Sequence, residues 1–151
     1  MRASVLAALL FTVGCADLPE GWEDAEPIPD FYQRQCAGGD PYEDYDERVE
    51  ASATADAVSV DYLEAHFRCA QDVEGFYKRS GDQVDVLVQP VDMNPSQVAG
   101  CDCLYDINMT LPVEPPSTVT VYRRWDNLNS SNDPVKIATV EASSSGADTG
   151  G

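Results

Sequence analysis

Apolar and polar residues alternate along much of the second half of the chain. In the segment 101–111 every odd-numbered position is cysteine or apolar, whereas the even-numbered positions, Leu104 apart, are Asp, Asn or Thr. The same period of two occurs at 58–62 and 84–88, and similar runs occupy 118–125 and 135–140. A period of two is typical of β-strands that bury one face in an antiparallel sheet. Each of these segments is therefore predicted to be a strand.

Turn signals separate these segments and indicate the fold class. Ser80-Gly81-Asp82 precedes the run at 84–88, as in a hairpin turn, and Pro115-Pro116 follows the run at 101–111. Short strands joined by turns over about 100 residues predict an all-β fold, a small antiparallel immunoglobulin-like β-sandwich over 31–142. One short helix is expected within it at 41–50, because Asp40-Pro41 followed by Glu43 resembles a capping box.

Residues 1–14 have the layout of a secretory signal peptide. Arg2 supplies a positive charge, and the apolar run 3–13 is shorter than the roughly 20 residues of a membrane-spanning helix. The segment 11–15, which ends in Gly14-Cys15, resembles the lipobox of bacterial lipoproteins. The resemblance implies cleavage before Cys15, lipidation of the Cys15 thiol and anchoring in a membrane of the bacterial envelope. Ala16 stands where enteric lipoproteins kept in the inner membrane have Asp, so the outer membrane is the expected location.

The chain is strongly acidic. It has 27 Asp and Glu against 9 Lys and Arg, a net charge of −18, which disfavours binding to nucleic acid. The segment 15–30 is rich in acidic residues and proline and has no Lys or Arg, which predicts an extended tether between lipid and domain. Trp22 within it is expected to contact either the membrane or the domain. At the other end, 143–151 is small and polar and is expected to be a flexible tail.

Four cysteines remain when Cys15 is set aside, an even number that suits disulfides in an oxidising compartment: Cys36, Cys69, Cys101 and Cys103. On an extended strand the Cα atoms of Cys101 and Cys103 lie about 6.5–7 Å apart, at the limit for a disulfide. Each is therefore expected to bond a different partner, one Cys69 and the other Cys36. The sequence leaves open which bonds which.

A metal site is the alternative use of the same side chains. His66, Cys69, Cys101 and Cys103 offer one imidazole and three thiolates, a ligand set that suits zinc or copper. Residues three apart on a continuous strand face opposite sides, however, so His66 and Cys69 would not converge. Two disulfides without a cofactor are therefore the preferred interpretation.

Signals for catalysis are weak, and the protein is expected not to be an enzyme. His66 is the only histidine, and neither a nucleophile elbow nor a Gly-rich phosphate loop accompanies it. The strongest candidate for a partner-binding patch is Arg123-Arg124-Trp125, because Arg and Trp are enriched at interface hot spots. Such residues can also protect the edge of a strand. A structural role, or the binding of an envelope or extracellular partner, is the expected function class.

Several of these motifs occur together in one group of proteins. His66-Phe67-Arg68-Cys69, a hairpin, the Cys101-Asp102-Cys103 strand and Val119-Thr120-Val121-Tyr122 resemble uncharacterised bacterial lipoproteins with an immunoglobulin-like sandwich and a Cys-x-Cys strand. The resemblance covers 56–140. It implies the sandwich fold and the envelope location, and it implies no activity.

Overall fold

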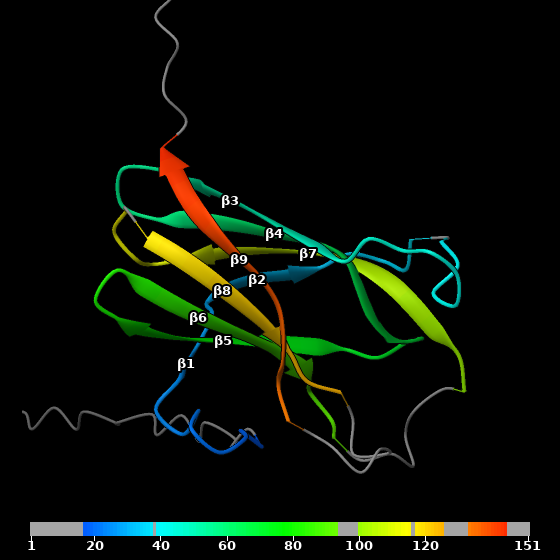
Figure 1. Cartoon of the computed structure of the whole chain (residues 1–151). Helices are drawn as coiled ribbons and strands as arrows, with labels where there is room; N and C mark the ends of the chain where they lie inside the picture. The colour runs from blue at the N-terminus through cyan, green and yellow to red at the C-terminus, as the bar shows by residue number, and fades with distance from the viewer. Residues whose placement is uncertain (1–16, 38, 94–99, 116, 126–132, 145–151) are drawn as a thin grey trace, which may run out of the picture.

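The computed structural model describes residues 17–37, 39–93, 100–115, 117–125 and 133–144, and these residues contain β-strands and no helix (Figure 1). Most of the strands coincide with the segments of alternating apolar and polar residues. The strands are β1 (Glu26–Pro27), β2 (Asp30–Gln33), β3 (Arg48–Ala53), β4 (Val58–Arg68), β5 (Val73–Ser80), β6 (Gln83–Pro90), β7 (Asp102–Leu111), β8 (Ser117–Arg123) and β9 (Val135–Ser144).

The strands form two sheets that share β9. One sheet has the order β1-β5-β6-β8-β9, and the other has the order β9-β3-β4-β7-β2. Neighbouring strands are antiparallel except for the β6–β8 and β3–β9 pairs, which are parallel. Figure 1 shows β9 crossing between the two sheets. The predicted all-β sandwich is therefore confirmed.

The alternation of the sequence determines which side chains fill the core between the sheets. The inward positions of β4, β6, β7 and β8 are almost completely buried and form one cluster of Val, Ile, Leu, Met and Tyr side chains. Val58, Val86 and Ile107 are examples with no exposed surface. Burial of each such side chain contributes roughly 1.5–3 kcal/mol, so the alternating strands supply most of the driving force for folding.

The N-terminal segment differs from the expected tether. Its described part, from Asp17 onward, packs along the outer face of the β1-β5-β6-β8-β9 sheet. Trp22 is 5% exposed and lies in a second apolar cluster with Phe76 of β5 and Leu87 of β6. Leu87 interrupts the alternation of β6 because the outer face of that strand is also covered. Between its acidic residues the segment therefore carries the apolar side chains that hold it against the domain.

The chain crosses from one sheet to the other between β1 and β2, beside Gly75. Ile28 donates its backbone N–H to the carbonyl of Gly75 in β5, and Phe31 of β2 packs over the same residue. A Cβ atom at Gly75 would lie 2.5 Å from the Phe31 ring. Gly75 therefore allows the chain to pass from one sheet to the other without leaving a gap.

Two local predictions were wrong. Residues 41–50 form a turn, an irregular segment and the start of β3, and not a helix. Asp40 does accept a hydrogen bond from the Tyr42 N–H, but Val49 pairs with Tyr62 in β4, and this sheet pairing replaces the helix. The predicted tail began at Ser143, whereas β9 continues to Ser144 by pairing in parallel with Ser52 and Ala53 of β3.

Candidate functional site

Two disulfides lie at one end of the sandwich, where β4 and β6 end and β5 and β7 begin. Cys36 bonds Cys103, and Cys69 bonds Cys101, with Cα separations of 5.8 and 5.5 Å. We call this the disulfide end. The expectation that each cysteine of the Cys-x-Cys strand bonds a different partner is confirmed, and the structure supplies the order that the sequence left open.

The disulfides remove the basis of the metal hypothesis. Cys69, Cys101 and Cys103 are all oxidised, so they have no thiolates to offer. Within the described residues no three His, Cys, Asp or Glu side chains are grouped so that they could hold a metal ion. The imidazole of His66 contacts other side chains, as described below.

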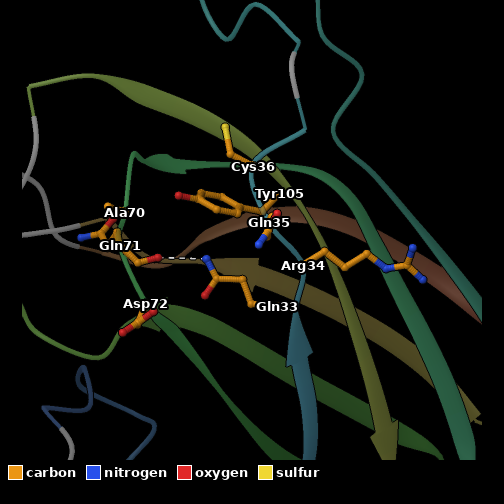
Figure 2. Close-up of a pocket in the computed structure, with 8 residues that line it drawn as sticks. All are labelled: Gln33, Arg34, Gln35, Cys36, Ala70, Gln71, Asp72 and Tyr105. Atoms are coloured by element: carbon orange, nitrogen blue, oxygen red, sulfur yellow. Dashed lines mark hydrogen bonds between the residues drawn. The ribbon is translucent and has the colours of Figure 1, made fainter.

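The disulfide end carries a pocket between the segment that follows β2 and the loop from β4 to β5 (Figure 2). Its volume is about 510 Å³, which is within the range of small-molecule sites. Its lining combines polar and apolar surface and consists of Gln33, Arg34, Gln35, Cys36, Ala70, Gln71, Asp72 and Tyr105. Figure 2 shows the Arg34 side chain extending away from the Gln71–Asp72 side of the pocket; its Nε donates to Asn108.

Gln33 holds the two walls of the pocket together. Its side-chain amide donates to the Gln71 carbonyl at 2.9 Å and accepts from the Val73 N–H at 2.9 Å. These are the two kinds of backbone hydrogen bond that a neighbouring β-strand would make. Ala70 has a φ of 55°, the left-handed turn that brings the loop back toward β5. The Tyr105 hydroxyl donates to the Arg68 carbonyl at 3.0 Å and fixes the start of the same loop. These hydrogen bonds fix the two walls of the pocket relative to each other.

The exposed part of the pocket is formed by a different set of side chains. Gln35 and Asp72 are exposed, and both line the pocket together with Cys36 of the Cys36–Cys103 disulfide. Gln71 is buried, and its side-chain nitrogen has no hydrogen-bond partner within the described part of the chain. The pocket thus combines a rigid floor with polar groups at its entrance.

His66 is the centre of a separate cluster on the outer face of β4. Its Nδ1 lies 2.8 Å from the Tyr45 hydroxyl, and its Nε2 lies 3.2 Å from a carboxylate oxygen of Asp102. The ring also packs edge-on against Trp125, with centroids 5.0 Å apart. Arg68 binds Asp102 at 3.3 Å from the other side. Both ring nitrogens of the histidine therefore face groups of its own chain, and the cluster ties the segment before β3 to the sheet.

Glu47 is a partly buried acceptor next to this cluster. It accepts hydrogen bonds from the Tyr62 hydroxyl and from the His66 backbone N–H, and it forms an ion pair with Arg123 at 3.1 Å. Burial, together with the negative charge of Glu47, raises the pKa of Tyr62 well above its usual value. The phenol therefore remains a hydrogen-bond donor to Glu47 at any ordinary pH.

Two of the three residues of the predicted partner-binding patch are buried, and the third, Trp125, is partly exposed. Arg123 and Arg124 are only 9% and 6% exposed. Arg123 points to Glu47 and the His66 carbonyl, whereas Arg124 points to the Gln89 side chain and the Asp17 carbonyl. Burial lowers the pKa of Arg124, and the charges of Asp17 and Asp133 partly offset that effect. β8 is an interior strand of its sheet, so these residues do not protect an edge either.

Several site residues carried little signal in the sequence. Gln33 and Gln71 are isolated amides, and only the three-dimensional structure reveals that Gln33 pairs with the β4–β5 loop. Tyr45 lies in the segment 41–50, where the sequence predicts a helix that does not form. Its hydroxyl contacts His66, which is 21 positions away in the sequence. Cys15 lies outside the described residues, and the described part of the chain has no helix able to span a membrane.

Comparison with known proteins gives no relative. No protein-family model, curated protein or solved structure matches the chain.

Proposed function

We propose that the chain is an exported, lipid-anchored, non-enzymatic binding protein of the bacterial envelope, with the outer membrane as its location. The two disulfides are the main support for export, because such bonds form and persist in oxidising compartments such as the bacterial periplasm. The lipobox-like segment 11–15 supports Cys15 as the anchored residue. The disulfides and the lipobox-like segment both support a location in the bacterial envelope.

Lipid attachment is tested by labelling cells that express the full chain with radioactive or clickable palmitate. We expect label on the wild-type protein, none on Cys15→Ser, and normal label on Cys36→Ser, the matched control for loss of a cysteine. Absence of label from the wild-type protein, with the chain recovered in soluble form, would overturn the lipid anchor.

A binding role at the disulfide-end pocket is supported by its construction. The Gln33 amide and the Cys36–Cys103 disulfide fix its walls before any ligand arrives, so little ordering cost accompanies binding. Gln35 and Asp72 at the entrance present an amide and a carboxylate. These groups suit a polar partner that offers hydrogen-bond donors. Amide side chains do not titrate near neutral pH and so do not serve as general acids or bases, which favours binding over catalysis by the amides of this pocket.

In-cell photocrosslinking tests the pocket directly. A benzophenone amino acid at Gln35 is expected to give a discrete adduct that Asp72→Arg abolishes. The same probe at Asp82, in the exposed β5–β6 turn at the opposite end of the sandwich, serves as the matched control. The same adducts from both positions, or none from position 35, would refute a specific partner at this pocket.

A further inference from the structure

The N-terminal segment is fixed to the domain from Asp17 onward. The Asp17 carbonyl accepts hydrogen bonds from the buried side chains of Arg124 and Gln89. Gln89 has no exposed surface, and its side-chain oxygen also accepts from Arg124. Releasing Asp17 would therefore withdraw a shared acceptor from two buried side chains, which opposes its release.

Apolar packing holds the next turn of the same segment. The Trp22 ring packs edge-on against Tyr122 with centroids 5.6 Å apart, and the ammonium group of Lys78 lies 4.4 Å from the centre of the Trp22 ring. Lys78 also donates to the Gly21 carbonyl at 2.7 Å. Cation–π contact adds to the burial of the indole. The segment is thus part of the packed domain and not a spacer.

This packing leaves a very short connection to the lipidated cysteine. Only Ala16 stands between Cys15 and Asp17, and two residues span at most about 7 Å. The polar headgroup layer on each side of a bilayer is itself roughly 5–7 Å thick. A lipid on Cys15 would therefore hold the domain against the headgroups, whereas an extended tether over 15–30 would have allowed it to stand far above them.

The end of the sandwich that carries Asp17 also exposes apolar side chains. Val91 is 56% exposed and Val135 is 52% exposed, and they are two of the four large apolar residues of the described chain with high exposure. Val91 lies two residues beyond Gln89, and Val135 pairs with Arg123, next to Arg124. Both therefore belong to the disulfide end, close to where the lipid would emerge.

We infer that the disulfide end, around Asp17, Val91 and Val135, rests on the surface of a phospholipid bilayer. This inference depends on the proposed lipidation of Cys15. Apolar contact and the covalent lipid hold the interface, because a net charge of −18 opposes attraction to anionic lipids. The occupant of this surface is the membrane to which the protein is itself anchored. Because the Val91 N–H donates to the Asp72 carbonyl at 3.0 Å, the pocket entrance lies beside this surface, and a partner at the pocket would have to be reached at the membrane surface.

Neutron reflectometry of the lipidated full-length protein on a supported phosphatidylcholine bilayer tests this placement. Protein density is expected to begin at the headgroup layer, with no protein-free water layer wider than about 7 Å, the reach of two residues. The matched control carries about 15 Gly and Ser residues between Ala16 and Asp17, which should raise the domain by roughly 20 Å.

The outcomes separate this inference from the proposed function. A lipidated protein whose domain already stands some 20 Å above the headgroups without the insertion would overturn the membrane contact and leave the lipid anchor intact. Absence of lipid on Cys15 would overturn both. As a second measurement, Val91→Glu together with Val135→Glu should widen the water layer without changing the lipid label, and an unchanged layer would exclude these two side chains from the contact.

Discussion

Replacement of Gly75 by alanine is a direct test of how the two sheets join. The new Cβ atom would lie 2.5 and 2.6 Å from two atoms of the Phe31 ring and 2.9 Å from the end of Ile28. Ordinary contacts begin near 3.4 Å, so the ring would have to move by nearly 1 Å in a packed region. Overpacking of this kind typically costs about 1–3 kcal/mol.

The intrinsic preference of the residue works in the opposite direction. Alanine in a strand interior is favoured over glycine by roughly 0.5–1 kcal/mol, so the net loss of stability for Gly75→Ala is expected to be about 0.5–2 kcal/mol. Gly100→Ala is the matched control, because nothing in the described part of the chain lies within 4 Å of its added Cβ. That variant should be as stable as the wild-type protein or slightly more stable.

Urea unfolding, followed by fluorescence, measures the free energy of unfolding of both variants. A lower midpoint for Gly75→Ala with an unchanged slope would identify a loss of stability. Phe31→Leu removes the clashing ring atoms. In that background Gly75→Ala should lower the free energy of unfolding by less than it does in the wild-type protein. If both glycine variants unfold at the same urea concentration, Phe31 and Ile28 do not pack closely against Gly75.

Three further predictions concern the outer face and the titrating groups. Trp22→Ala should lower the free energy of unfolding by about 3 kcal/mol, whereas Glu20→Ala, on the exposed side of the same segment, should change it little; equal effects in thermal unfolding would contradict the packing of this segment. Burial raises the pKa of the Glu74 carboxyl, and the hydrogen bond from Gln89 partly lowers it. The wild-type protein should therefore gain stability relative to Glu74→Gln as the pH falls from 7 through the folded-state pKa, and a pH-independent difference in urea midpoint would refute this. Since burial also raises the pKa of Tyr62, the unfolded chain loses that proton first above about pH 10 and stability falls. Tyr62→Phe should show a shallower decline over the same alkaline range in circular dichroism, and identical slopes would count against the buried phenol.

The sequence predicts the strands well because each buries one face. Val58 and Ile107 follow the alternation, and both are fully buried. The spacing of Cys101 and Cys103 likewise disfavours a bond between them, and the structure pairs each with another cysteine; which partner each takes depends on strand register. Local pattern therefore determines which segments are strands and which face of each is buried.

The errors arise where distant residues override a local pattern. The acidic composition of 15–30 indicated an extended tether, but Trp22 finds Phe76 and Leu87, more than fifty residues away. Two consecutive arginines suggested an exposed patch, yet Arg123 meets Glu47 and Arg124 meets Gln89 inside the domain. A single sequence does not reveal such partners because charge and hydropathy describe each residue alone.

The position of β9 has a mechanical consequence. Asp17 is held at the disulfide end, near Arg124, whereas β9 ends at Ser144 beside Ala53, at the opposite end of the sandwich. A force applied between a membrane anchor and a load on the C-terminal side would therefore act along the strands. The hydrogen bonds of β9 to β8 and β3 would bear that force together in shear instead of opening one at a time. Forced unfolding is governed by the unfolding rate, so a domain pulled along this axis should resist tension far longer than one peeled from the side.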